Sequence, residues 1–173
     1  MERVPEEKDM FDITIIGAGP TGLFGAFYAG MRGLKTKVID ALPDLGGQLT
    51  ALYPEKYIYD TPGHPKVLSK DLVKLLHEQT LLFPPTFCLD EEIVGLEKLE
   101  DGTFLLQSKE AVHRSKVVII CAGIGAFSPN RHAAPGVAEL EGKRVHYKVK
   151  EKDLFRGKRL LVIGGGDSAV DWA

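Results

Sequence analysis

The chain has 173 residues, of which 22 are basic and 24 acidic, with a formal net charge of −2 and an apolar share of 44%. This balance is typical of a folded domain and excludes a polyelectrolyte or a disordered tail. No apolar stretch reaches the roughly 20 residues that span a membrane. The first residues lack the basic and then apolar order of a signal peptide, so we expect a cytoplasmic protein. Nucleic-acid binding is not expected, because basic and aromatic residues do not alternate.

A glycine-rich motif follows the first strongly apolar run. Residues 13–16 are Ile-Thr-Ile-Ile and predict a buried strand, and residues 17–22 are Gly-Ala-Gly-Pro-Thr-Gly. Where a strand turns into a helix, glycines allow a tight bend, close approach of a pyrophosphate to peptide N–H groups, and close packing of the helix. We therefore expect a dinucleotide to contact Gly17, Gly19, Thr21 and Gly22.

An acidic residue stands about 20 residues beyond these glycines, as such sites require. Asp40 closes the next apolar strand, residues 36–39. A carboxylate there accepts hydrogen bonds from a ribose 2′-OH and repels a 2′-phosphate, so the first site should hold FAD or NAD. The alternative is that Asp40 is a solvated strand end.

The helix after the first motif should pack closely on the sheet. Gly22, Ala26 and Gly30 recur every four residues and predict a stripe of small side chains facing the strands. Gly33 then predicts the end of this helix.

A long loop should follow Asp40. Gly46, Gly47, Gln48 and residues 52–63 contain too many turn residues for a regular element, and a loop at the carboxyl ends of strands is where ligands bind. Ser69 is a candidate N-cap of the next helix, which the apolar spacing extends until Pro84 and Pro85 interrupt it.

An antiparallel meander is expected before the parallel sheet resumes. Residues 92–98 and 103–108 flank a Glu-Asp-Gly turn, and residues 116–121 form a strongly apolar strand. The loop after this strand is rich in small residues, which lets the backbone approach a cofactor. Phe127 in that loop would cap an adenine or a flavin, or else it is a core aromatic residue.

A second motif closes the chain. Residues 160–163 are Leu-Leu-Val-Ile and predict another strand, followed by Gly-Gly-Gly-Asp-Ser-Ala at residues 164–169. We expect this second nucleotide to contact Gly164, Gly166, Asp167 and Ser168. Because the sequence ends four residues after the motif, we expect it to be the front part of a longer protein. The residue that would choose between NAD and NADP lies beyond it.

Other chemistry is not indicated. Cys88 and Cys121 adjoin apolar residues in expected strands and are interpreted as buried free thiols. The five histidines are scattered, so we expect no metal site. Residues 143–159 are rich in lysine and arginine, which would steer an acidic protein carrier or serve as a solvated linker.

Taken with its motifs, the sequence resembles the front half of the thioredoxin-reductase-like ferredoxin (or flavodoxin) NADP reductases, flavoproteins in which an NADPH domain interrupts an FAD domain. The resemblance covers residues 10–173. It depends on both glycine motifs, on Gly-Gly-Gln-Leu at residues 46–49, and on Leu-Tyr-Pro-Glu-Lys-Tyr-Ile-Tyr-Asp at residues 52–60.

The resemblance implies roles for individual residues. Gly17, Gly19 and Gly22 would hold the FAD pyrophosphate, and Asp40 the adenosine ribose. The flavin end would be bound by Gly47 and Gln48, with Tyr53 stacked on the ring. The family resemblance also implies that Ile93 meets the adenine through its backbone, that Phe127 lies beside the cofactor, and that the intact protein is a homodimer.

The absence of one motif separates two groups of this fold. Thioredoxin reductase carries a redox Cys-x-x-Cys just before its second glycine motif, whereas residues 145–152 here contain no cysteine. Without a thiolate to attack and a thiol to resolve, electrons should leave from the flavin itself. We therefore expect NADPH to reduce FAD, and FAD to reduce ferredoxin or flavodoxin, with no side chain acting as a general acid or base.

The expected fold is α/β, a Rossmann-like FAD/NAD(P)-binding domain whose parallel sheet carries an antiparallel β-meander, followed by the start of a second such domain. We expect the first part of the FAD domain at residues 1–128, a connecting segment at 129–157 and the truncated NAD(P)H domain at 158–173. Two alternatives remain open: an NAD(P)H-dependent flavin oxidase or small-molecule reductase of the same fold, and, for these 173 residues alone, an inactive nucleotide-binding fragment.

Overall fold

The computed structural model describes residues 6–125, 131–147, 149, 151–166 and 169–170, with side-chain burial given from residue 9 onward. The chain divides into two compact units, Met1–Ser128 and Pro129–Ala173. Within the described residues no helix is both long and apolar enough to cross a membrane.

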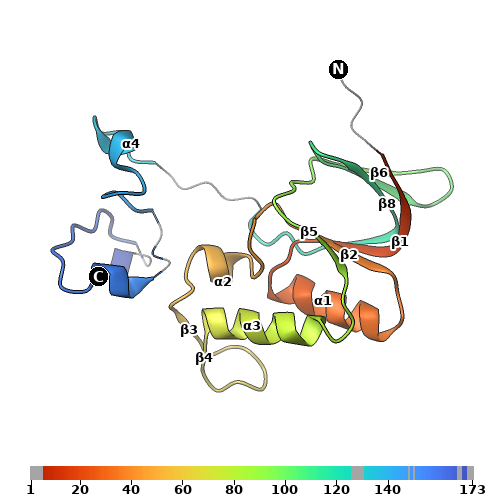
Figure 1. Ribbon diagram of the computed structural model, residues 1–173, viewed down its shortest axis with the longest axis horizontal. Coiled ribbons are helices and arrows are strands. Elements are labelled where there is room, and N and C mark those ends of the chain that lie inside the picture. The colour runs from red at the N-terminus through yellow and green to blue at the C-terminus, as the bar shows by residue number, and fades with distance from the viewer. Residues whose placement is uncertain (1–5, 126–130, 148, 150, 167–168, 171–173) are drawn as a thin grey trace. The chain divides into compact units, whose positions relative to one another are not determined.

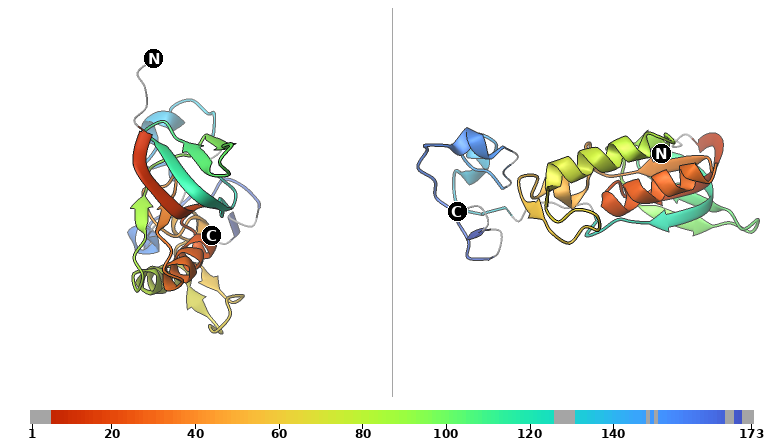
Figure 2. Two further views of the ribbon diagram at one scale, coloured as in Figure 1. Left: turned by 90° about the vertical axis from the view of Figure 1, so that its right-hand side faces the viewer. Right: turned by 90° about the horizontal axis from the view of Figure 1, so that it is seen from below.

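The first unit is built on a mixed sheet with a parallel core. In the described part of the chain its six strands have the order β5-β2-β1-β8-β7-β6. The strand β1 (Glu6–Ile16) is central and pairs in parallel with β2 (Thr36–Ile39), which in turn pairs in parallel with β5 (Thr86–Cys88). The helices α1 (Pro20–Met31) and α3 (Ser69–Thr80) lie side by side on one face of the sheet (Figures 1 and 2).

The predicted meander forms the other end of the same sheet. The strands β6 (Gly95–Lys98) and β7 (Phe104–Gln107) make an antiparallel hairpin. The next strand, β8 (Val112–Ile120), begins four residues earlier than expected. Its first half pairs antiparallel with β7, while its length pairs in parallel with β1. A single strand therefore joins the meander to the parallel core, and the α/β fold with its antiparallel meander is confirmed.

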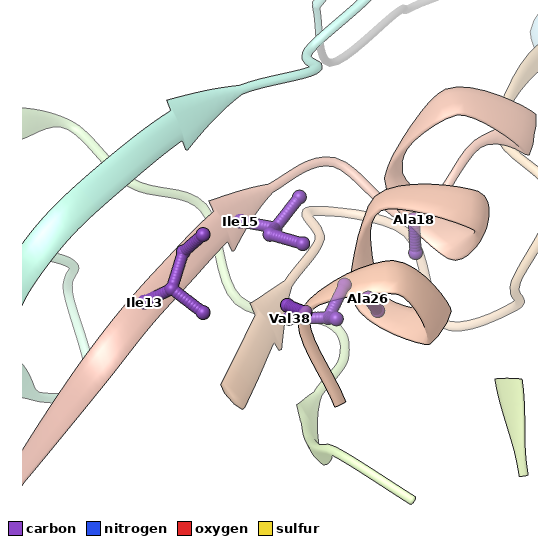
Figure 3. Packing of buried hydrophobic residues seen from close by; sticks show 6 residues of the cluster. Ile13, Ile15, Ala18, Ala26 and Val38 are labelled. Atoms are coloured by element: carbon purple, nitrogen blue, oxygen red, sulfur yellow. The ribbon is translucent and has the colours of Figure 1, made fainter. Parts of the chain in front are cut away.

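The core lies between the sheet and α1. Ile15, Val38 and Ala26 are fully buried, and Figure 3 shows the isoleucines of β1 and the valine of β2 directed toward the small side chains of Ala18 and Ala26. Small residues on the helix let its axis approach the branched strand residues closely. The last residue of the small-residue stripe differs from expectation, because a Cβ on Gly30 would meet Phe83, not the sheet.

The ends of both helices show which local signals held. The first ends at Met31, and Gly33 adopts φ +74° and donates its N–H to the Gly30 carbonyl, as a helix stop requires. Ser69 is not the N-cap of α3. The N-cap residue is Leu68. The buried Ser69 hydroxyl does not cap the helix, because it donates instead to the carbonyl of the distant Lys56 at 2.8 Å.

The segment after Asp40 is more regular than a loop. It contains the short helix α2 (Gln48–Ala51) and a two-stranded antiparallel sheet of β3 (Tyr57–Ile58) and β4 (Val67–Leu68). The Leu49 and Ala51 side chains are buried. Packing against α3 stabilises elements this short, which their local sequence would not form alone.

The second unit contains the helix α4 (Val137–Leu140) and the 3₁₀ helix η1 (Lys152–Phe155). The strand expected at residues 160–163 is not formed, and all four of these side chains are exposed. A strand needs a neighbouring strand for its backbone hydrogen bonds. Among the described residues, no strand lies beside residues 160–163 to pair with them.

Candidate functional site

The first unit has a cleft of about 470 Å³ at the carboxyl ends of its parallel strands. Its walls include Ile16 and Ile39, the last residues of β1 and β2, and Ala122, just after β8. Ligands of open α/β sheets bind at this edge, and the volume suits an organic ligand. Eight residues predicted from the sequence line it: Gly17, Gly19, Thr21, Asp40, Gly47, Gln48, Tyr53 and Ile93.

The three glycines of the first motif meet three separate structural demands. Gly17 has φ +108°, and a Cβ there would lie 2.3 Å from the Cys121 carbonyl oxygen. A Cβ on Gly22 would lie 1.8 Å from the Gly17 carbonyl oxygen, so no side chain fits where helix and loop touch. A Cβ on Gly19, in contrast, would meet nothing within 4 Å. The space beside Gly19 is therefore open, as close approach of a phosphate to peptide N–H groups requires.

The start of α1 is suited to an anion. Gly19 is the N-cap residue, Pro20 begins the helix and the first turn has no acidic side chain. The free N–H groups and the helix dipole at such an end favour a negatively charged group. The geometry of the motif thus fits the pyrophosphate of a dinucleotide.

Asp40 binds the glycine loop as well as facing the cleft. Its Oδ2 accepts a hydrogen bond from the Ala18 N–H at 2.5 Å, and its Oδ1 accepts one from the Leu42 N–H at 2.8 Å. Because each carboxylate oxygen accepts more than one hydrogen bond, both retain capacity for ribose hydroxyls. The Asp40 side chain is partly buried and accepts two backbone hydrogen bonds. It is therefore not the solvated strand end of the alternative interpretation.

The opposite wall comes from the segment before and within α2. A Cβ on Gly47 would lie 3.2 Å from the Gly19 Cα, and the Gly46 N–H donates to the Ala18 carbonyl at 2.9 Å, so the two glycine segments are in contact. The Gln48 amide lies close to Gly123, where a Cβ would approach its Nε2 to 3.4 Å. The half-buried Tyr53 also lines the cleft.

Sequence reasoning missed Glu91 and Glu92, which line the cleft beside Ile93. Their signal was available, since these two acidic residues lie three and four positions after the end of β5, at the carboxyl edge of the sheet. Burial alone would raise the pKa of the Glu91 carboxyl, but hydrogen bonds from Ser108 and His113 and the positive charge of Lys37 outweigh it, and the pKa is lowered. Glu91 is therefore ionised at neutral pH.

The remaining predicted residues lie elsewhere. Gly22 is buried behind the cleft, and Phe127 lies outside the described residues. Gly164 and Gly166 are exposed in the second unit, whereas Asp167 and Ser168 are outside the described residues. The amides of Ala169 and Val170 donate to the Gly166 carbonyl, and these two residues are helical.

The described residues contain no cluster of three or more histidine, cysteine or acidic side chains that could hold a metal ion. Cys88 and Cys121 are not joined in a disulfide, and both are only partly buried, which corrects the expectation that they are buried. Cys88 ends β5 and Cys121 directly follows β8, so both lie at the carboxyl ends of strands. Burial raises the pKa of the Cys121 thiol, so the protonated form is favoured there.

Comparison with known proteins agrees with this geometry. Residues 11–173 match the family described as pyridine nucleotide-disulphide oxidoreductase. The chain belongs to this family. The matched range includes both glycine motifs of this chain, one in each unit.

Curated relatives in this family are similar over nearly the whole chain. A ferredoxin–NADP reductase of Geobacillus kaustophilus (strain HTA426) is 56% identical over 170 residues, covering 98% of this chain and 51% of the relative. A ferredoxin–NADP reductase 2 of Shouchella clausii (strain KSM-K16) is 55% identical over 168 residues, covering 97% and 51%. The resemblance read from the motifs is thus confirmed, and the chain spans about half the length of the curated relatives it matches.

Solved structures share the fold. Thioredoxin reductase from Streptococcus pyogenes MGAS5005 superposes with a TM-score of 0.60 at 24% identity, over 75% of this chain and 40% of that protein. The complex of OTEMO with FAD and NADP has a TM-score of 0.69 at 20% identity, over 94% of this chain and 36% of that protein. At these identities the likeness shows the Rossmann-like FAD/NAD(P)-binding fold alone.

Proposed function

We propose that the intact protein is a flavoprotein oxidoreductase that passes electrons between NADPH and ferredoxin through FAD. The observation that carries this proposal is the 56% identity to a protein named ferredoxin–NADP reductase, over 170 residues that include the complete cleft. The cleft supplies the geometric support, because each glycine of the first motif has the environment that a dinucleotide site needs.

The residues of the cleft would divide the cofactor between them. The N-terminus of α1 and the backbone at Gly17 and Gly19 would hold the pyrophosphate, with Asp40 accepting hydrogen bonds from the ribose. Gln48 and Tyr53 would orient the ring and restrict access to one face. When bound, FAD supplies the chemistry, accepting a hydride and releasing electrons one at a time.

The second motif would bind the nicotinamide nucleotide in the same manner, through Gly164, Gly166, Asp167 and Ser168. The expected division at residues 1–128, 129–157 and 158–173 remains part of this proposal. We further propose that the intact protein is a cytoplasmic homodimer and that flavodoxin is an alternative carrier. Lysines and arginines between residues 143 and 159 would favour an acidic carrier of either kind.

The test uses the purified intact protein. We expect a flavin absorption band that bleaches on anaerobic addition of NADPH, and reduction of cytochrome c that depends on added ferredoxin. A dithiol substrate such as thioredoxin should not be reduced, since residues 145–152 have no cysteine.

Two results would contradict the proposal. NADPH oxidation that consumes oxygen and is unaffected by ferredoxin or flavodoxin would assign the protein to the flavin oxidases. A protein that binds no flavin after incubation with FAD would remove the basis of any flavoprotein assignment.

A further inference from the structure

A chain of polar side chains crosses the interior of the first unit and ends at the wall of the cleft. Lys37 on β2 is fully buried, and its Nζ lies 3.0 Å from Nδ1 of His113 on β8. His113 is 3% exposed, and its Nε2 lies 2.7 Å from Oε1 of Glu91, a residue of the cleft lining. Three segments distant in the sequence therefore meet through one buried imidazole.

The hydrogen-bond partners assign the proton positions along this chain. A lysine ammonium is a donor only, so Nδ1 of His113 accepts from Lys37. Nε2 then carries the proton and donates to the Glu91 carboxylate, which also accepts from the Ser108 hydroxyl at 2.6 Å. The imidazole of His113 thus links the buried Lys37 to the partly buried Glu91 carboxylate.

Stability alone gives weak grounds for such an arrangement. Removing a lysine and a glutamate from water costs several kcal/mol per ion, and apolar side chains of similar volume often serve the fold as well. The ring of Phe11, 4.2 Å from the Lys37 ammonium, offers only partial compensation. The position of Glu91 in the fold suggests a second role.

The wall that contains Glu91 has no regular structure of its own. Between β5 and β6 the chain is neither helix nor strand, and Asp90 adopts φ +59°. The Asp90 N–H donates to the Leu42 carbonyl at 3.0 Å, and the Glu91 N–H donates to the Asp40 carbonyl at 2.9 Å. The wall is therefore fixed to the ribose-binding segment by its backbone and to the sheet interior by the Glu91 side chain.

We propose that the buried Lys37–His113–Glu91 chain positions the adenosine end of the cleft, holding the backbone at Ile93 and Asp40 where a bound dinucleotide needs them. This inference rests on the proposed function, since FAD is the dinucleotide concerned. Glu91 is a positioning residue, because it acts through the wall it anchors.

The test measures dissociation constants of ADP and of FAD for the intact protein stripped of nucleotide. Glu91→Ala removes the anchor, and we expect both constants to rise together by about tenfold, the effect of one lost charge-assisted hydrogen bond. Glu91→Gln keeps an acceptor oxygen for His113 and Ser108, and should bring both constants back to within about threefold of the wild type.

Two further variants separate position from general stability. Tyr53→Ala, at the flavin end, should weaken FAD but leave ADP unchanged. Glu97→Gln, an exposed glutamate on β6 outside the cleft, should change neither constant. The protonated Nε2 of His113 should give a distinct signal in long-range ¹H–¹⁵N spectra of the wild type, and this signal should shift in Glu91→Ala.

The outcomes distinguish the inference from the function beneath it. If the wild type binds FAD and Glu91→Ala binds ADP equally well, the positioning role is wrong while the flavoprotein proposal stands. If the wild type binds neither nucleotide, both are wrong. Should Glu91→Ala fail to fold, Ser108→Ala removes one of the two hydrogen bonds to Oε1, and an unchanged ADP constant there would overturn the inference.

Discussion

The glycines of the first motif differ in what surrounds them, although the sequence presents them as equivalent. Around Gly22 the backbone of Gly17 occupies the space of a side chain, whereas around Gly19 that space is open. Helix packing therefore requires the glycine at position 22, whereas the open space at Gly19 is where the proposed dinucleotide would approach the loop. The two demands are separable by substitution with alanine, the smallest side chain that adds a Cβ.

We predict that Gly19→Ala leaves folding almost unchanged but weakens FAD binding at least about tenfold, because the methyl group displaces a phosphate from the N–H groups. Gly22→Ala should instead lower the free energy of unfolding by about 1–3 kcal/mol, because the helix must move away from Gly17. Thermal unfolding of the nucleotide-free protein and FAD titration check both. Gly33→Ala, at a glycine away from the cleft, is the control for the effect of backbone strain at a helix end on stability and FAD binding. Equal effects of Gly19→Ala and Gly22→Ala on the free energy of unfolding would contradict the distinction between the two glycines.

The two helices that cover the sheet are connected by one buried side chain. The Thr80 hydroxyl, at the end of α3, lies 3.0 Å from the Leu23 carbonyl of α1 and 2.7 Å from the Leu76 carbonyl of its own helix. Thr80 is fully buried, so water cannot replace its hydroxyl as the hydrogen-bond donor to either carbonyl. The hydroxyl thus fixes the end of one helix against the other.

Replacing this hydroxyl by a methyl group tests its contribution. Thr80→Val keeps the shape and removes the donor, and should lower the free energy of unfolding by about 1–3 kcal/mol, the cost of a buried group left without its partner. Urea unfolding followed by circular dichroism measures this. Glu78→Gln, at an exposed position of the same helix two residues earlier, is the matched control and should change stability by less than about 0.5 kcal/mol. A Thr80→Val variant as stable as this control would show that the contact is dispensable.

Elements whose signal is local were predictable from the sequence. The strand β2 has the predicted bounds, and the hairpin turn at Gly102 follows the Glu-Asp-Gly signal. The binding edge was also predictable, because strand ends and glycine spacing define it without knowledge of packing. Eight predicted residues meet in one cleft for this reason.

Features that depend on distant partners were not predictable. The buried Lys37 looks in the sequence like an ordinary strand lysine, and only the fold brings His113, 76 positions later, to its ammonium group. Ser69 follows the N-cap pattern, yet Lys56 takes its hydroxyl. The short helix α2 and the β3–β4 pair likewise depend on packing against α3, which their local sequence does not reveal.

At the scale of the molecule, the two cysteines of the chain lie apart in the sheet. Cys88 ends β5 and Cys121 follows β8, and these strands are separated by β2 and β1. Three strand spacings amount to about 14 Å, roughly twice the Cα separation that a disulfide tolerates. This pair cannot serve as a dithiol without rearranging the sheet.

The double variant Cys88→Ala/Cys121→Ala therefore decides whether either thiol takes part in electron transfer by the intact protein. We expect ferredoxin-dependent reduction of cytochrome c by NADPH to continue at the wild-type rate within about twofold, since each change removes only a partly buried sulfur and costs at most modest stability. The flavin content of each preparation, read from its absorption band, serves as the control for misfolding. Loss of carrier reduction with full flavin content would contradict direct transfer from the flavin and would return a thiol to the electron path.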